Sequence, residues 1–378
     1  MSTQTSEQFR THFPMLDNIV HLANCSQGAL SNEVDASMQE MLESIRRHGA
    51  PWGRWAEVWE EARTLFAAMI HASRDEIAIM PSATIGAYQV ASTLSFRKRT
   101  GIVSTEMEFP SVGQVWRGQE KNGAVVTYAP EDDGFVSADE YERLITPETA
   151  LVSVPSVSYK NGARLPVAEV AKIARSNGAR VFIDAYQGAG VLPIDVRTLD
   201  CDYLVAGSLK YMLGLAGMAF LYIRGGVTDE INPSLTGWFG RTNPFDFDPT
   251  LTDFPPEARR MESGTASVPS AYATKAGLQL LATLDPAEVW DHAAGLTQYL
   301  TDRLQEMGVS LYSPIDPQLR GPQVAVRADD AEALGEFLAS RNISASPRGD
   351  VVRLAVHYYN NMTDMDACIA ALGEYFSA

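Results

Sequence analysis

A single lysine interrupts an almost entirely apolar stretch at residues 204–223. Lys210 lies within "VAGSLKYMLGLAG", between glycines. The stretch is long enough to span a bilayer, but its glycines and serine, and the lack of a second such stretch, disfavour a membrane helix. A lysine that extends its charge to the surface is the simplest alternative. A third interpretation is chemical, because an amine in apolar surroundings has a lowered pKa and can form a Schiff base with an aldehyde.

Other polar residues follow short apolar runs, at points where strands are predicted to end. They are Asp184 after 180–183, Ser82, Ala83 and Thr84 after 76–80, and Phe109 after 101–105. In open parallel sheets, ligands bind at the carboxyl ends of the strands. Taken singly, an aspartate after a strand is usually a turn or cap residue, and Ser-Ala-Thr before a helix is usually an N-cap.

Taken together, these residues supply the parts of a pyridoxal 5'-phosphate site. Lys210 would bind the aldehyde, and Asp184 would keep the pyridine nitrogen protonated. A helix N-terminus carrying the hydroxyls of Ser82 and Thr84 suits the phosphate. Phe109 would stack on the ring.

The elements that must position these residues alternate along the chain. Runs typical of strands occur at 76–80, 101–105, 124–128, 150–154, 180–183, 202–206 and 219–223. Helical patterns such as 167–177 lie between them, which predicts an α/β domain with one seven-stranded, mostly parallel sheet. Residues 243–269 are rich in Pro, Asp and Gly, which predicts a loop. A helical pattern at 271–307, broken near 285–286, then precedes strands at 323–327 and 351–357 and helices at 331–341 and 364–376, an α+β region.

Bulk properties narrow the classes of function. The chain has 378 residues and a formal net charge of −17, which argues against a nucleic-acid partner. Its length exceeds what one core usually supports, so a large and a smaller domain are expected. The three cysteines and six histidines show no disulfide or metal-ligand spacing, so no metal is expected. The N-terminal residues lack an apolar signal region, and we expect a cytoplasmic protein without a membrane segment.

Three segments make a specific resemblance: "FIDAYQGAGVLPIDV", "CDYLVAGSLKYMLGLAGMAFLYIR" and "RRMESGTASVPS". They resemble the class V aminotransferase family of fold type I pyridoxal phosphate enzymes, which includes cysteine desulfurases, selenocysteine lyases, kynureninases and isopenicillin N epimerase. The resemblance runs from "HLANCSQGAL" to "VVRLAVHYYNN", nearly the whole chain. It implies a large cofactor-binding domain at 17–260 and a small α+β domain at 261–378, with the segment 1–16 packed against the small domain.

The resemblance also implies roles for individual residues. Asp184 would pair with the pyridine nitrogen and Gln187 with the phenolic oxygen. Ala83 and Thr84 would hold the phosphate, with Ser208 adding a side chain. Thr265 would reach the phosphate of the neighbouring subunit, so a homodimer is expected. Arg353 resembles the arginine that binds the substrate carboxylate, a task suited to guanidinium; its simplest alternative is a surface salt bridge.

Some positions depart from the family pattern. Leu209 stands where many members have a histidine before the lysine, and Phe109 stands where many stack a histidine on the ring, as in the kynureninase branch. Tyr159 replaces an asparagine common in its turn. The loop "SASPRGDVVR", which carries the persulfide-forming cysteine in cysteine desulfurases, has no cysteine. Sulfur transfer through a persulfide on that loop is therefore disfavoured.

These features favour an enzyme acting at the α-carbon of an amino acid, with an aminotransferase first because it needs only Lys210 as a proton carrier. The main alternative is a C–S β-lyase, of the cysteine-conjugate or selenocysteine lyase kind, without a persulfide cysteine. An epimerase would need a second base, for which Tyr159 and His357 are only nominal candidates, and a kynureninase-like hydrolase ranks with it. A binding module without turnover is disfavoured by the intact Lys210, Asp184 and Arg353.

Aromatic residues elsewhere bear on the entrance to the site. In "GWFGRTNPFDF", Trp238, Phe239 and Arg241 are candidates for the mouth of the site, or for an interface or the core. Three further tryptophans, Trp52, Trp55 and Trp59, follow helical spacing, for which core packing is favoured over an entrance wall.

Overall fold

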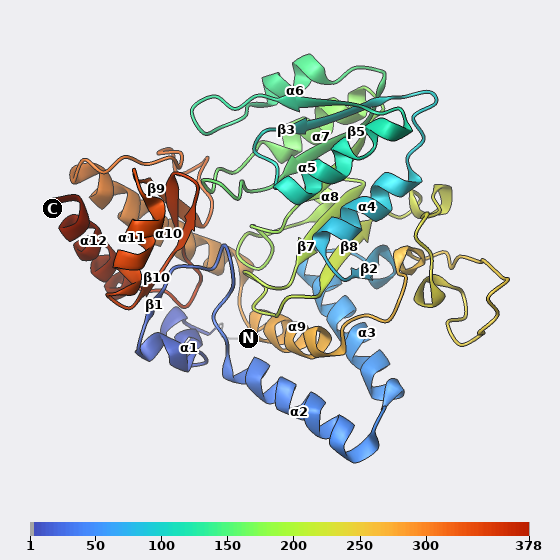
Figure 1. Cartoon of the computed structure of the whole chain (residues 1–378), viewed down its shortest axis with the longest axis horizontal. Helices are drawn as coiled ribbons and strands as arrows, with labels where there is room; N and C mark the ends of the chain where they lie inside the picture. The colour runs from blue at the N-terminus through green and yellow to red at the C-terminus, as the bar shows by residue number, and fades with distance from the viewer. Residues whose placement is uncertain (1–3, 378) are drawn as a thin grey trace.

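The computed structural model describes residues 4–377, apart from the side chain of Asp229. The first three residues of the predicted segment 1–16, and residue 378 of the predicted domain 261–378, lie outside the described residues. Within that range the chain forms one large sheet covered by helices, joined to a smaller body that contains the C-terminal elements (Figure 1).

A seven-stranded, mostly parallel sheet is the centre of the molecule, as the sequence predicts. Its order is β2-β8-β7-β6-β5-β3-β4, and β8 is antiparallel to both of its neighbours. Each predicted strand is present, with bounds that differ by one or two residues at most. The strands are β2 (Ile77–Met80), β3 (Gly101–Thr105), β4 (Val125–Ala129), β5 (Thr149–Pro155), β6 (Arg180–Asp184), β7 (Tyr203–Gly207) and β8 (Ala219–Ile223).

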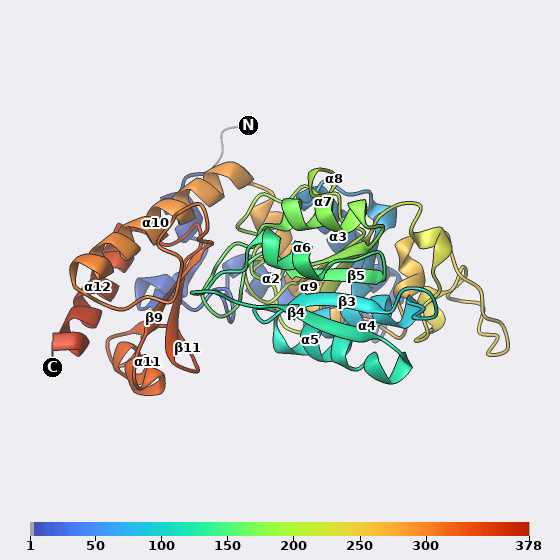
Figure 2. The same ribbon diagram turned by 90° about the horizontal axis from the view of Figure 1, so that it is seen from above.

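Helices cover both faces of the sheet, so its central strands are apolar on both sides. Figure 2 shows α6 and α7 on one side and α4 and α5 on the other. Trp116 packs on Phe182 from the α5 side, at 5.1 Å between ring centroids, and Phe66 of α3 stacks on Phe220 from the other side at 4.3 Å. These helices are α3 (Trp52–Met69), α4 (Ala83–Thr93), α5 (Pro110–Arg117), α6 (Ala138–Leu144), α7 (Val167–Ser176) and the short α8 (Val196–Leu199).

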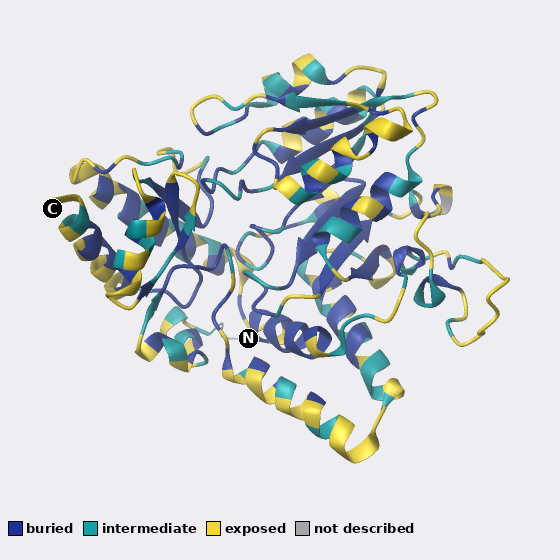
Figure 3. Ribbon diagram, in the orientation of Figure 1, coloured by how far each residue is buried: buried dark blue, intermediate teal, exposed yellow. Residues whose placement is uncertain are grey.

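Two long helices follow the predicted loop, separated at the predicted break. They are α9 (Val268–Leu281) and α10 (Pro286–Glu306). The predicted loop 243–269 extends two residues too far, because α9 already begins at Val268. Pro269 lies in the first turn of α9, where its missing N–H has no helical partner to lose. α9 packs against α3 and against the amphipathic α2 (Asn32–His48), whose outer face is exposed (Figure 3).

The C-terminal elements form a second, three-stranded antiparallel sheet of order β11-β12-β9. Helices α11 and α12 and the strand pair β1-β10 lie beside it. The elements are β9 (Gln323–Arg327), α11 (Ala331–Ala339), β10 (Ile343–Ser344), β11 (Ser346–Arg348), β12 (Val351–Ala355) and α12 (Met362–Ser377).

The N-terminal residues pack against these C-terminal elements. Arg10, at the end of α1 (Ser6–Arg10), forms an ion pair with Asp364 of α12 at 2.8 Å, and Phe9 stacks on Tyr359. β1 (Val20–His21) pairs with β10. The domain boundary between 260 and 261 stays a prediction.

Candidate active site

Lys210 follows the end of β7 in a tightly packed turn. Gly28 donates its N–H to the carbonyl of Leu209 at 3.1 Å, and a side chain at Gly28 would lie 2.4 Å from the carbonyl oxygen of Lys210. A side chain at Gly207 would lie 2.1 Å from the ring of Tyr186. The glycines around the lysine are therefore required by close backbone approach.

The amine of Lys210 lies against aromatic rings, and the residue is half-buried. Its Nζ is 4.4 Å from the ring centroid of Tyr186 and 5.7 Å from that of Phe109. Burial is the main cause that lowers the pKa of Lys210 to about 8, although nearby Asp184 opposes the change. A lysine whose amine is partly neutral near physiological pH is suited to Schiff-base chemistry and proton transfer.

Two buried carboxyl groups lie close to each other near this amine. Asp184, at the end of β6, accepts the N–H of Tyr186 at 2.8 Å through Oδ1. Glu108 accepts the hydroxyl of Ser153 at 2.8 Å and the N–H of Phe109 at 3.0 Å. Burial, followed by the charge of Asp184, raises the pKa of Glu108 to about 8. Glu108 therefore keeps its proton at neutral pH. Burial also raises the pKa of Asp184, whereas the N–H of Tyr186 and the charge of Lys210 oppose that rise.

Beside Asp184, two buried polar atoms have no partner among the described residues. Gln187 donates through Nε2 to the carbonyl of Cys25 at 3.1 Å, but its Oε1 has no partner. Ser156, just after β5, also has a hydroxyl without a partner. Buried polar atoms usually have partners, so these two atoms, with the amine and carboxylate nearby, fit a bound polar ring such as that of pyridoxal phosphate.

The predicted phosphate-binding residues begin α4. Ser82 is its N-cap and accepts the N–H of Ile85 at 3.3 Å. Ala83 and Thr84 occupy the first turn, and the hydroxyl of Thr84 has no partner in the described part of the chain. Free N–H groups and the helix dipole favour an anion at such an end. Ser208 uses its hydroxyl hydrogen within the lysine turn, toward the carbonyls of Leu215 and Met218, so its role toward a phosphate stays a prediction.

Arg353 is buried, with 2% of its surface exposed, which rules out the surface salt bridge. It donates to the carbonyls of Ser346 and Tyr159, at 3.3 and 3.0 Å, and to the hydroxyl of Ser26 at 3.3 Å. Among the residues described, no carboxylate is paired with it. A buried guanidinium with only neutral partners is prepared for an anionic ligand, because a buried charge requires a counter-ion.

The remaining candidates have contacts that limit their roles. Both ring nitrogens of His357 are hydrogen-bonded to backbone, to Tyr211 at 2.9 Å and Tyr358 at 2.7 Å, and burial lowers the pKa of His357 to about 4. His357 is therefore unsuited as a second base. Tyr159 contacts Phe109 edge-on, at 5.1 Å between ring centroids. Phe109 itself is 40% exposed, so part of its ring is accessible for stacking on a ligand.

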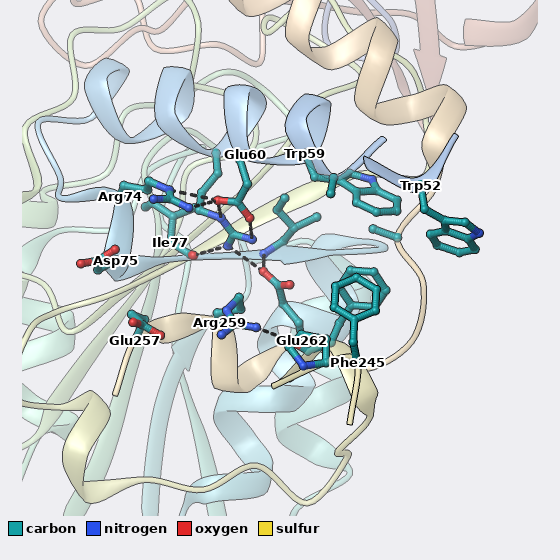
Figure 4. A pocket seen from close by; sticks show the side chains of 16 residues that line it. Trp52, Trp59, Glu60, Arg74, Asp75, Ile77, Phe245, Glu257, Arg259 and Glu262 are labelled. Carbon is teal, nitrogen blue, oxygen red and sulfur yellow. Dashed lines mark hydrogen bonds and ion pairs between the residues drawn. The ribbon is translucent and has the colours of Figure 1, made fainter. Parts of the chain in front are cut away.

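A separate cavity of about 360 Å³ lies between α3, the edge strand β2 and the segment before α9 (Figure 4). Trp52, Trp59, Phe239 and Phe245 form one end of it. Trp59 is buried, as core packing predicts, whereas Trp52 is half exposed and contacts Trp238 at 5.9 Å. The residues predicted to bind the cofactor do not line this cavity.

An ion-pair network next to this cavity holds the segment that leads to Thr265 (Figure 4). Arg63 contacts Glu262 at 2.6 Å, and Glu262 also accepts the N–H of Ile79 in β2 at 2.8 Å. Three residues further on, Thr265 is exposed. The structure thus holds Thr265 at the surface, and its role toward a phosphate stays a prediction.

Sequence reasoning did not assign roles to Glu108, Tyr186, Ser156 or Ser26. Glu108 directly precedes Phe109, and Tyr186 lies between Asp184 and Gln187. Their positions after predicted strands were the available signal. Ser156 likewise follows a predicted strand, whereas Ser26 carried no such signal, because its place in the site depends on a contact between distant segments.

Comparison with known proteins identifies the class that this fold and site define. The family model for class-V aminotransferases matches residues 30–373, and the chain belongs to this family. An uncharacterised aminotransferase of Bacillus subtilis, YcbU, is 36% identical over 95% of each chain. A probable cysteine desulfurase of Halalkalibacterium halodurans is 28% identical over 98% of each chain. The apo cysteine desulfurase of Thermococcus onnurineus has the same fold, with a TM-score of 0.90 at 23% identity over 100% of this chain and 99% of its own.

The protein is therefore an enzyme of fold type I, and its cofactor is pyridoxal 5'-phosphate. In the described range 4–377, no helix is long and apolar enough to cross a membrane. Among the same residues, no group of three or more His, Cys, Asp and Glu side chains is arranged to hold a metal ion.

Proposed function

We propose that this class-V enzyme is an aminotransferase acting at the α-carbon of an amino acid. The observation that carries the proposal is the meeting of Lys210, whose pKa is lowered to about 8, with the buried carboxyl group of Asp184 and with Arg353, which is buried and has no carboxylate partner among the described residues. Pyridoxal phosphate, when bound, stabilises negative charge that develops at the substrate α-carbon. The 36% identity to a protein described as an aminotransferase supports this choice.

The roles follow from the chemistry of each group. The Nζ of Lys210 removes the proton from the α-carbon, a task that suits an amine with a pKa near the working pH. Asp184 holds a proton on the pyridine nitrogen, and Glu108, by keeping its own proton, adds no second negative charge. Arg353 binds the α-carboxylate and so fixes the direction of the bond that is broken.

Other residues hold the cofactor in this proposal. Ala83 and Thr84 bind the phosphate at the N-terminus of α4, with Ser82 capping the helix. Gln187 faces the phenolic oxygen, since it retains one N–H beyond its bond to Cys25. Phe109 stacks on the ring. The enzyme works as a homodimer in which Thr265 completes the phosphate site of the partner subunit, which is supported by the exposure of Thr265 and the anchoring of Glu262.

The alternative is β-elimination from a substrate with a carbon–sulfur bond, which begins with the same proton removal. The segment from Ser344 to Arg353 contains no cysteine, so a persulfide on that loop has no carrier. The two reactions differ after this step. In transamination Lys210 would deliver the proton to the cofactor, whereas in elimination the carbon–sulfur bond would break, the sulfur compound would leave, and hydrolysis would release pyruvate and ammonia.

The experiment is incubation of the purified holoenzyme with single amino acids while the cofactor spectrum is recorded. Transamination converts the cofactor to its pyridoxamine form with formation of a 2-oxo acid, whereas elimination releases pyruvate, ammonia and the sulfur compound. A spectrum that no amino acid changes would contradict both reactions.

Borohydride reduction tests the assignment of Lys210 itself. The cofactor should be fixed to the peptide that contains residue 210, and Lys210→Met should abolish both labelling and turnover. Lys275→Met is a control, since Lys275 is also a lysine shielded from solvent but is paired with Glu61 at 3.4 Å. Labelling of Lys275 or another lysine would overturn the assignment.

A further inference from the structure

The hairpin that carries Arg353 brings a second arginine to the same site. β11 and β12 are antiparallel, with Ser346 opposite Arg353. The hydroxyl of Ser346 is hydrogen-bonded to that of Ser26 at 2.8 Å, and Ser26 also contacts Arg353. Ser346 therefore faces the site. Because alternate residues of a strand point to the same side, Arg348 faces the site as well.

Packing of the intervening residue gives the same orientation. Pro347 points toward α11, where a side chain at Gly335 would lie 2.4 Å from its Cγ. Arg348 must then project from the opposite side of β11. Figure 2 shows that this side faces the body that contains the seven-stranded sheet, with α11 on the other side.

Arg348 acts electrostatically on groups of the site and has no counter-ion. The positive charges of Arg348 and Arg353 both oppose the rise in the pKa of Tyr159 that burial causes, and both add to the lowering for Lys210. The titratable groups around Arg348 are thus Tyr159 and Lys210, with Arg353 as a like charge. Across residues 4–377, no carboxylate is paired with Arg348, whereas Asp350 on the same hairpin is paired with Arg327 at 3.0 Å.

We propose that Arg348 determines substrate specificity by binding a negatively charged side chain of the amino acid, such as a carboxylate or sulfinate. This rests on the proposed function, in which Arg353 holds the α-carboxylate. Two guanidinium groups without protein counter-ions then receive the two anionic groups of one substrate. A substrate with a neutral side chain leaves Arg348 in water, which an exposed arginine tolerates.

The test compares substrates that differ in charge but not in size. kcat/KM is measured with holoenzyme for glutamate against glutamine and for aspartate against asparagine. We expect the wild type to prefer the acid of each pair, and Arg348→Gln to lower kcat/KM for the acids about 10- to 30-fold while changing it for the amides less than about threefold. Arg348→Lys should restore part of the preference. Because Arg348 is exposed, added salt should weaken the preference.

Arg327→Gln is the matched control, because Arg327 lies on β9 of the same three-stranded sheet and is paired with Asp350. It should leave the acid-to-amide ratio unchanged. Equal losses for acids and amides in Arg348→Gln, or a wild type that does not prefer acids, would overturn the role of Arg348 while leaving the proposed function standing. Failure of every amino acid to change the wild-type cofactor spectrum would overturn the proposed function, and this inference with it.

Discussion

Replacing Lys210 by methionine should raise the free energy of unfolding of the apoenzyme. The reason is that burial disfavours the charged amine of Lys210 in the folded state. Its pKa falls from the ordinary 10.5 to about 8 on folding. Each unit of pKa change corresponds to about 1.4 kcal/mol, so the charged amine destabilises the folded state by about 3 kcal/mol at pH 7. Loss of the contact with Tyr186, 4.4 Å from Nζ, offsets about 1 kcal/mol. A net gain of about 2 kcal/mol remains, since methionine is a flexible side chain of similar length.

The gain must depend on pH in a definite direction. The unfolded lysine binds its proton up to pH 10.5, whereas the folded lysine releases it above about 8. Between these values the unfolded state holds more protons, so the stability of the wild type rises with pH and approaches that of the variant. The penalty is complete below pH 8 and disappears toward pH 10.5.

Urea unfolding of the cofactor-free proteins at pH 7 and at pH 9.5 measures the effect. We expect the difference between Lys210→Met and wild type to shrink by about half or more at the higher pH. Lys275→Met serves as the control and should show no gain, because its amine is paired with Glu61. A gain of equal size at both pH values would mean that apolar packing is responsible and that the charge of the buried amine does not destabilise the folded protein.

Three further predictions test the site. Asp184→Asn should fold normally and lower kcat about 100-fold or more, because an amide cannot hold the proton on the pyridine nitrogen; near-wild-type turnover would make Asp184 only a cap. Arg353→Ala should raise KM and lower kcat, so that kcat/KM falls by an amount equivalent to about 2–5 kcal/mol of binding free energy. An unchanged KM would indicate another carboxylate-binding group. Joint replacement of Cys25, Cys201 and Cys368 by alanine should leave kcat within about threefold, since none lies in the loop 344–353 that leads to Arg353; loss of activity in a folded variant would revive a persulfide route.

The fold shows how much local sequence can determine. Strand and helix patterns predict the seven-stranded sheet because the residue types of each segment reflect which of its sides are buried. In β6, for example, Val181, Phe182 and Ile183 are all buried between two helical layers. The place where α9 begins was predicted less well. Pro269 reads as a loop residue, although a first helical turn accepts proline.

Lys210 and Asp184 were identifiable from the sequence alone, because each follows a strand whose carboxyl end must lie at one edge of the sheet. The contacts that give them their properties were not. Asp184 raises the pKa of Glu108 only because β5, which carries Ser153, lies between β3 and β6 in the sheet, an order that the chain sequence does not state. The burial of Arg353 and the direction of Arg348 likewise depend on how a C-terminal hairpin packs against Ser26 and Tyr159, near residues far away in the chain. Side-chain type and local pattern determine which groups are available, and tertiary packing decides which of them meet, lose their water and change their pKa values.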